Sequence, residues 1–307
     1  MMPACLSVQQ ACLGHGNRLC LALPPPPGGV GILMLPEYIS RSLVMIDAHC
    51  HLTYPGLWEN LPQVINEAKR VLDAVVTCGL PFDQVKEPGF PGAMRALELA
   101  EIHKNFIHVT LGLHPTQVGE MSDEEVESYV EFVAANCGRI VGIGEIGLDN
   151  YWIKSEEERG KARRVFLEFL ELAEKLDKPV VIHSREAESE VLDILSSFSL
   201  KKVLMHSFTG NMTTAKAALE RGYFFSVNYR LTNTKTMRKI AKNFPLESIL
   251  LETDAPFLSP TGGVNTPVSV RIVAEEVAKL RGLSLEVVDE ITARNAVEFF
   301  GLRIRRW

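Results

Sequence analysis

Short runs rich in Val, Ile and Leu alternate with longer amphipathic stretches from Ser42 to the end of the chain. Nearly continuous apolar runs of this kind are typical of parallel strands that are buried on both faces. The predicted strands span residues 43–47, 72–77, 106–113, 140–145, 179–183, 202–206, 223–227 and 249–254.

The stretches between these runs have the period of helices. Ser122 and Glu125 form the capping-box pattern that begins a helix, and Val126, Tyr129 and Val133 follow at helical spacing. Because each parallel strand needs a crossover helix, eight alternating strands and helices predict an α/β protein, a single-domain TIM (β/α)8 barrel. A doubly wound open sheet uses the same units and is the alternative. Further helical patterns cover residues 166–176, 267–280 and 285–300.

Residues 1–44 lack this periodicity. Four consecutive prolines at 24–27 and the two glycines after them cannot continue a helix or a central strand. We therefore expect a disordered N-terminal extension over 1–44 and the barrel over 45–304. Met45 directly precedes the first predicted strand, which is consistent with an upstream start codon, and a docking arm is the alternative.

The composition, 46% hydrophobic and 23% charged, is that of a globular enzyme. A net charge of −6 argues against strong non-specific binding to nucleic acid, although a nuclease can attract phosphate through bound metal ions. The six cysteines form no CxxC pair, and the sequence has neither a secretory signal nor an apolar run of the ~18 residues that span a membrane. These features predict a cytoplasmic protein with no membrane partner, and they specify no oligomeric state.

Unusual polar residues stand at the carboxyl ends of the predicted strands, where barrel enzymes place their active sites. Four imidazoles and two carboxylates that meet there would bind borderline divalent cations such as Zn²⁺ or Mn²⁺. Two histidines two residues apart can chelate one ion, and a glutamate can bridge two ions through its two oxygens. The residues are His49, His51, His183, His206, Glu145 and Asp254, with His114 after the third strand.

Several nearby residues have structural explanations. His103 and His108 fall at a helix end and a strand start, away from the predicted mouth, and we interpret them as structural. Asp149 and Glu252 fit either partners that orient the ligands or ordinary surface charges. The glycines around Glu145 lie within a strand and its exit, so we interpret them as permitting close backbone approach and not as a phosphate-binding loop.

Six motifs, in order, resemble the signature series of the TatD family of metal-dependent deoxyribonucleases, within the amidohydrolase superfamily. The resemblance covers roughly residues 45–302. The motifs are MIDAHCHL at 45–52, GLHP at 112–115, GEIGLD at 144–149, VIHSR at 181–185, HSFTG at 206–210 and LETDAP at 251–256.

The resemblance implies a metal-dependent TIM barrel that holds two divalent ions per chain, Zn²⁺, Mn²⁺ or Mg²⁺. Described family members are 3′-5′ DNA exonucleases or nucleases of abasic sites, and some relatives deacylate mischarged tRNA. The implied ligands are His49, His51 and Asp254 for the first ion, His183 and His206 for the second, and Glu145 as the bridge.

The catalytic residues that the resemblance implies are Asp254 and Glu145. A hydroxide activated by the two ions would attack the phosphodiester, and Asp254 would accept the proton of the attacking water. His114 and Arg185 would bind the substrate. The chain departs from the family at three places. One is the helix before the fifth strand, where Ala162 and Phe169 stand in a segment that often carries Gln. Asn150, Tyr151 and Trp152 follow the GLD sequence where an aromatic residue and an arginine are usual, and the loop 261–267 has none of the usual cations.

The predicted function is therefore a TatD-like DNase or 3′-5′ exonuclease with DNA as the nucleic-acid substrate. The lack of cations in the loop 261–267 predicts a shallow dependence of DNA binding on salt. Hydrolysis of an acyl ester or amide, for example by an aminoacyl-tRNA deacylase, is the alternative that shares the site. A non-catalytic barrel scaffold is a further alternative, and it predicts a damaged set of ligands.

Truncation tests the predicted division of the chain. A chain that begins at Met45 should keep the melting temperature and activity of the full chain, because an extension without apolar periodicity contributes no core. Thermal unfolding and activity of the two chains, measured side by side, check this. A loss of many degrees on truncation would show that residues 1–44 pack on the barrel.

Overall fold

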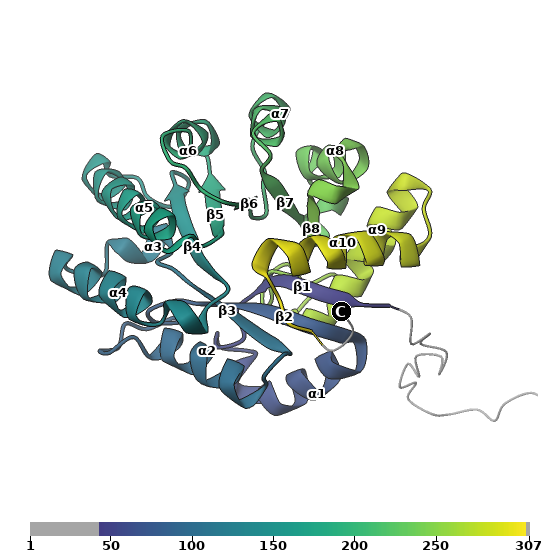
Figure 1. Ribbon diagram of the computed structural model, residues 1–307, viewed down its shortest axis with the longest axis horizontal. Coiled ribbons are helices and arrows are strands. Elements are labelled where there is room, and N and C mark those ends of the chain that lie inside the picture. The colour runs from purple at the N-terminus through teal and green to yellow at the C-terminus, as the bar shows by residue number, and fades with distance from the viewer. Residues whose placement is uncertain (1–42, 305–307) are drawn as a thin grey trace, which may run out of the picture. The chain divides into compact units, whose positions relative to one another are not determined.

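The computed structural model describes residues 43–304, so nearly all of the predicted extension, 1–44, lies outside the described residues. The described residues form a parallel sheet of eight strands in the sequential order β1 to β8. Helices surround this ring of strands (Figure 1). The order confirms the TIM barrel, because a doubly wound sheet would reverse its strand order at a switch point. The strands are β1 Met45–Cys50, β2 Leu72–Gly79, β3 Ile107–Leu111, β4 Gly142–Asp149, β5 Val180–Arg185, β6 Val203–Met205, β7 Phe224–Val227 and β8 Ile249–Leu251.

The helices confirm the sequence pattern. Ser122 accepts a hydrogen bond from the Glu125 amide at 3.2 Å, and Glu125 accepts one from the Ser122 amide at 2.7 Å, which is the predicted capping box. The helices are α1 Leu61–Val71, α2 Pro91–Ile102, α3 Pro115–Val118, α4 Asp123–Ala135, α5 Glu156–Leu176, α6 Glu188–Leu195, α7 Met212–Glu220, α8 Lys235–Asn243, α9 Val270–Arg281 and α10 Leu285–Phe300. Short 3-10 turns are η1 Trp58–Asn60, η2 Cys137–Arg139, η3 Tyr229–Thr232, η4 Leu246–Ser248 and η5 Pro267–Ser269.

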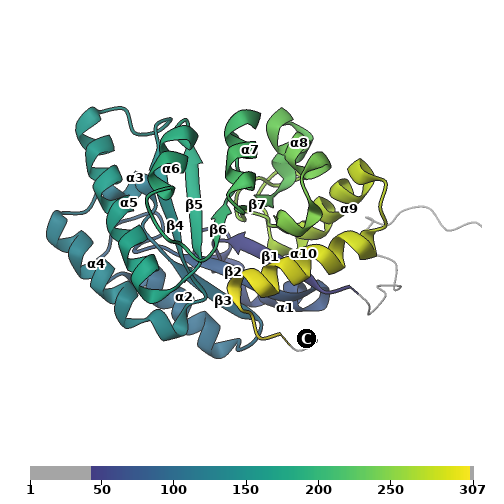
Figure 2. The ribbon, with the colours of Figure 1, turned by 45° about the horizontal axis from the view of Figure 1, so that its top comes forward.

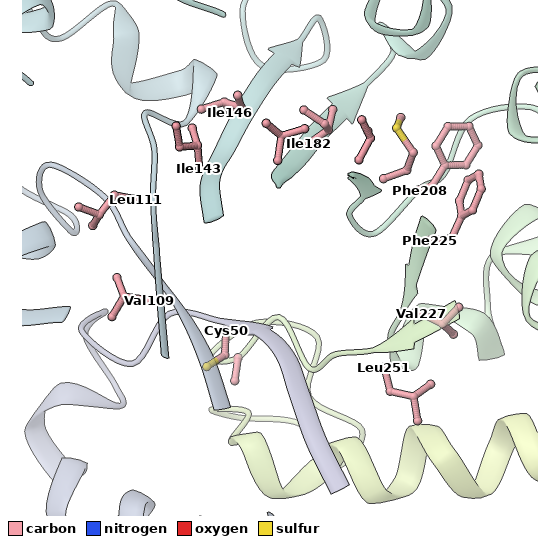
Figure 3. Close-up of a cluster of buried hydrophobic side chains, with 14 of the residues drawn as sticks. Cys50, Val109, Leu111, Ile143, Ile146, Ile182, Phe208, Phe225, Val227 and Leu251 are labelled. Carbon is pink, nitrogen blue, oxygen red and sulfur yellow. The ribbon is translucent and has the colours of Figure 1, made fainter. Parts of the chain in front are cut away.

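Two clusters of buried apolar side chains hold these elements together. The larger cluster joins the strands to the surrounding helices, and Figure 3 shows part of it, with Leu111, Ile143 and Val227 on three different strands. The smaller cluster joins strand residues such as Ile46 to Phe299 of α10. Helix α10 accordingly lies beside β1 (Figure 2). Among residues 43–304, no helix has the length and apolar character needed to cross a membrane.

The ring is joined between its first and last strands at the carboxyl-terminal mouth. The Asp254 amide donates to the His49 carbonyl at 3.0 Å, and the His51 amide donates to the Ala255 carbonyl at 2.7 Å. The fully buried Asp47 carboxylate accepts hydrogen bonds from the Thr253 amide at 2.9 Å and from its hydroxyl at 2.6 Å. Burial raises the pKa of Asp47 well above its usual value. These bonds fix the loop that carries Asp254 against the end of β1, which carries His49 and is followed by His51.

Most predicted strand ends differ from the observed ones by one to four residues, and two of these differences affect the site. The fourth strand continues to Asp149 and does not end at Glu145, because Gly147 and Asp149 pair in register with β5. The pairing register shifts between Ile143 and Ile146, and such an irregularity re-aims the side chains beside it. The eighth strand ends at Leu251, so Asp254 lies on the loop beyond it.

The glycines around Glu145 permit close backbone approach, as predicted. A Cβ atom on Gly144 would lie 2.6 Å from the Val181 Cβ, and one on Gly147 would lie 1.9 Å from the His183 carbonyl oxygen. Both glycines also have backbone φ angles, +154° and +148°, that L side chains rarely adopt. The fourth and fifth strands therefore approach each other closely where the site lies.

Replacement of Gly147 by alanine tests this contact. The variant should lose about 2 kcal/mol or more of unfolding free energy, because both the steric clash and the φ angle oppose a Cβ atom. Thermal unfolding of the variant and the parent chain measures the loss. The matched control is Gly160→Ala, since Gly160 lies in α5 with open space around it, and alanine favours a helix by up to about 1 kcal/mol. Equal melting temperatures for Gly147→Ala and the parent chain would contradict the close approach.

Candidate metal centre

The Glu145 side chain is buried at the centre of the mouth, and its Oε2 atom faces the end of β1. It lies 3.4 Å from the Nε2 atom of His49 and 3.7 Å from that of His51. The two imidazole nitrogens are themselves 3.2 Å apart. The Oδ1 atom of Asp254 completes this group, 3.5 Å from His51 and 3.9 Å from His49.

The other carboxylate oxygen of Glu145, Oε1, faces a second group of histidines. The Nδ1 atom of His183 lies 2.7 Å away, and the Nε2 atoms of His114 and His206 each lie 3.6 Å away. The facing nitrogens of His114 and His183 are 3.2 Å apart. One carboxylate therefore presents a separate oxygen to each of two sets of imidazoles.

Charge around Glu145 keeps it ionised. Burial alone would raise the pKa of Glu145, but the positive charge of His206 and hydrogen bonds from His183 and His49 hold that pKa well below its usual value. Burial also lowers the pKa of His206, but the carboxylates of Glu252, Glu145 and Asp254 raise it to about 10. A protonated His206 must lose its proton to become a ligand, so capture of a cation here releases protons.

Two buried carboxylates orient two of the histidines. Glu252 accepts a hydrogen bond from the Nδ1 atom of His206 at 2.8 Å, and Asp149 accepts one from the Nε2 atom of His183 at 3.1 Å. Each bond leaves the opposite ring nitrogen directed at Glu145. Both carboxylates are nearly inaccessible to solvent, which decides between the two interpretations that the sequence left open. They are partners of the candidate ligands and not surface charges.

Two further residues of this network were not predicted from the sequence. The fully buried Asn228 donates hydrogen bonds to Glu252 at 2.8 Å and to the Ser207 hydroxyl at 2.9 Å. The Cys78 sulfur accepts a hydrogen bond from the Glu145 amide at 3.1 Å. Both residues lie at the carboxyl ends of their strands, β7 and β2, so the rule that located the histidines could have found them.

His114 lies both in the cluster and on the cleft. The sequence assigned it to the substrate, and its side chain lines the cleft described below. Its Nε2 atom also lies within the cluster, 3.6 Å from Glu145, and its Nδ1 atom is 2.7 Å from the Thr116 hydroxyl. Burial lowers the pKa of His114 to about 3, with a further contribution from His183. A neutral imidazole can act as a ligand. By contrast, His103 and His108 lie outside the cleft described below, in agreement with their structural interpretation.

The residues present fit divalent metal ions. Within each group that could hold an ion, the ligand atoms all lie within 4.8 Å of one another. Imidazole nitrogens mixed with carboxylate oxygens are the ligands that Zn²⁺ and Mn²⁺ accept. The groups are His49, His51 and Glu145; His49, His206 and Asp254; and His114, Glu145 and His183.

Every residue of this cluster except His49 lines a cleft of about 720 Å³. The cleft has the size of a small-ligand site, which is commonly about 300–1,000 Å³. Aromatic and aliphatic side chains line one part of it, among them Tyr54, Phe82 and Phe257. Arg185, which the sequence assigned to the substrate, also lines the cleft.

A TIM barrel with buried imidazoles and carboxylates at its carboxyl-terminal mouth defines the class of metal-dependent hydrolases. The model of the TatD related DNase family matches residues 46–301, and the chain belongs to this family. It is a metal-dependent hydrolase, as the sequence predicted.

Similar proteins of known sequence or structure agree with this family assignment. An uncharacterized metal-dependent hydrolase of Methanocaldococcus jannaschii is 33% identical over 265 residues, covering 86% of this chain and 100% of the relative. Deoxyribonuclease TATDN3 of Homo sapiens is 31% identical, covering 83% of this chain and 94% of the relative. The crystal structure of a TatD homolog from Escherichia coli superposes with a TM-score of 0.75 at 25% identity, covering 84% of this chain and 98% of that chain.

Substitution of the orienting carboxylates tests how the histidines are held. Asp149→Asn and Glu252→Gln should each weaken divalent-metal affinity by about 10- to 100-fold, because the ligand ring loses its charged acceptor. Titration with Zn²⁺ against a competing chelator measures the affinity. Asp193→Asn is the matched control, since Asp193 is exposed on α6. Affinities within error of the parent chain in both variants would assign these carboxylates to stability alone.

Proposed function

We propose that the protein is a metal-dependent deoxyribonuclease that hydrolyses phosphodiester bonds at DNA ends. The observation that carries this proposal is the position of Glu145, whose two oxygens face separate groups of imidazoles. Hydrolysis of a phosphodiester between two cations uses such a bridging carboxylate, because charge develops on both the attacking and the leaving oxygen. The name of the human relative, a deoxyribonuclease, supports DNA as the substrate.

The proposed ligand set is the one that the family resemblance implies. One ion would take His49, His51 and Asp254, the other would take His183 and His206, and Glu145 would contact both. His206 also approaches Asp254, at 3.9 Å, so it lies between the two groups. When bound, the cations would supply Lewis acidity that polarises the phosphoryl oxygens and makes a water molecule a better nucleophile.

Asp254 is the proposed acceptor of the proton from that water. Its side chain is 17% exposed, more than that of Glu145 at 4%, and it lines the cleft. Burial raises the pKa of Asp254, but a hydrogen bond from His51 and the charges of His206 and His51 lower it overall. The carboxylate is therefore ionised at neutral pH and able to accept a proton.

The apolar wall of the cleft suits a nucleobase. Phe257 is 43% exposed and packs edge-on against Tyr54, with ring centroids 5.1 Å apart. Phe257 also lies 5.9 Å from the His51 ring, so this surface adjoins the candidate metal ligands. Stacking of a base on an exposed ring contributes about 1–3 kcal/mol and does not depend on sequence.

Two alternatives are less favoured. A non-catalytic scaffold predicts a damaged ligand set, whereas all six predicted ligands meet in one cluster. Hydrolysis of an acyl ester would use the same cluster, but no observation specific to this chain favours it.

We also propose a cytoplasmic location, which the free thiols of Cys50, Cys78 and Cys137 support, because a reducing compartment maintains them.

Glu145→Gln is the decisive variant. The parent chain should bind close to two divalent ions and degrade DNA from its ends. The amide should lower the metal content and reduce activity by at least about two orders of magnitude, since it removes charge from both groups while keeping the shape of the side chain. Elemental analysis and hydrolysis of end-labelled single- and double-stranded DNA measure the two effects.

The matched control is Glu131→Gln, an exposed position on α4, which should change neither quantity. Full activity and unchanged metal content in Glu145→Gln would refute the two-ion mechanism. A metal-loaded parent chain that leaves DNA intact but cleaves an aminoacyl ester would refute DNA as the substrate.

A further inference from the structure

Two arginine side chains line the cleft without an ion pair to any residue between 43 and 304. Arg185 is the last residue of β5, and Arg230 lies in η3, which follows β7. Strands β5 and β7 flank β6, and His206 directly follows β6. Both side chains are partly buried. A guanidinium group that is partly removed from water and lacks an anion is unfavourable, so these positions call for an anionic ligand.

The carboxylates of the cleft do not supply that anion. Glu120 lines the cleft as well, but it is exposed and pairs with neither arginine in the part of the chain that the structure describes. The two guanidinium groups therefore have no carboxylate partner among the described residues. The other four carboxylates have partners of their own: Asp83 with Arg95 at 3.1 Å, Asp149 with His183 at 3.1 Å, Glu145 with His183 at 2.7 Å and Asp254 with His51 at 3.5 Å.

A chain of hydrogen bonds connects the Arg230 backbone to His206, a candidate metal ligand. Its amide donates to the Asn228 side-chain oxygen at 3.1 Å, and Asn228 in turn donates to Glu252 at 2.8 Å. Glu252 accepts the hydrogen bond from His206 at 2.8 Å. The backbone from which the Arg230 guanidinium extends therefore has a fixed position relative to a candidate ligand.

Arg185 is fixed by a different contact. Its guanidinium carbon lies 3.8 Å from the centre of the Tyr151 ring and 5.5 Å from that of Trp152. Stacking on an aromatic face positions a guanidinium and leaves its N–H groups available for a ligand. Tyr151 and Trp152 belong to the segment where the chain departs from the family pattern, and the Trp152 amide is held by Asp149 at 2.7 Å.

The geometry points to a second phosphate subsite, formed by Arg185 and Arg230, that binds the phosphate next to the scissile phosphodiester. This inference rests on the proposed function and refines its substrate: a nucleotide chain that carries a second phosphate beside the diester to be cleaved. Two arginines in the same cleft as the candidate metal ligands match the repeated negative charge of a polynucleotide backbone. Each guanidinium can bind a phosphate through two hydrogen bonds. The subsite also supplies phosphate contacts that the neutral loop 261–267 lacks.

Dinucleotides that differ by one phosphate test the subsite. We expect the parent enzyme to cleave thymidylyl-thymidine with a kcat/KM about 10- to 100-fold lower than the same dinucleotide carrying an added terminal phosphate. Separate 5′-phosphorylated and 3′-phosphorylated substrates identify the side on which the subsite lies. In Arg230→Gln, most of the preference for the added phosphate should be lost, and Arg230→Lys should restore part of it.

A binding measurement that does not depend on turnover completes the test. Thymidine 3′,5′-bisphosphate contains no diester to cleave, and its dissociation constant for the metal-loaded enzyme can be measured by calorimetry at several salt concentrations. Arg230→Gln should weaken binding about tenfold or more and lower the salt dependence by about one ion. Arg238→Gln, which removes the same charge from an exposed position on α8, should leave binding and the substrate preference unchanged.

Equal cleavage of all three dinucleotides by the parent enzyme would overturn the subsite. An equal loss on all three in Arg230→Gln would also overturn it, because Arg230 would then serve the scissile phosphate or the fold. If the parent enzyme cleaves none of them but binds the bisphosphate through Arg230, the subsite stands as an anion site and the proposed phosphodiesterase function fails.

Discussion

The buried negative charge of Glu145 is the constraint around which the barrel mouth is arranged. A carboxylate removed from water is costly by several kcal/mol unless opposite charge and hydrogen bonds surround it. Here the compensation comes from imidazoles on β1, β5 and the residues that follow β3 and β6. Because one strand cannot supply these groups, the site exists only when the ring of strands is complete, and the fold and the chemistry depend on each other.

Much of this arrangement can be predicted from the sequence, for a physical reason. Parallel strands buried on both faces must be apolar along their whole length, so a histidine or a glutamate at the end of such a run is conspicuous. Carboxyl ends of parallel strands share one side of a barrel, so residues such as His51 and His206 could be brought together without knowledge of any distance. The order of the strands likewise followed from the alternation with helices.

Other features could not be predicted from the local sequence, because they depend on contacts between distant segments. The end of a strand is set by its neighbour, and β4 continues past Glu145 because β5 pairs with it as far as Arg185. Whether Asp149 is a surface charge or a partner of His183 depends on that continuation. Asn228 follows the end of β7, where the rule for strand ends applies, but its hydrogen bond to Glu252 and the bond that it accepts from the Arg230 amide appear only in the structure.

The joint between the first and last strands has a consequence for how the protein is made. Asp47 and Thr253 are bonded across 206 residues of sequence, a loop whose closure carries a large entropic cost. On the ribosome the amino-terminal strands emerge first, and the segment from β8 to Ala255 emerges near the end of synthesis. His49 and His51 therefore spend most of translation without Asp254 beside them. The full set of candidate ligands first exists when almost the whole barrel has been synthesised, so cation capture belongs to the last stage of biogenesis and not to the nascent chain.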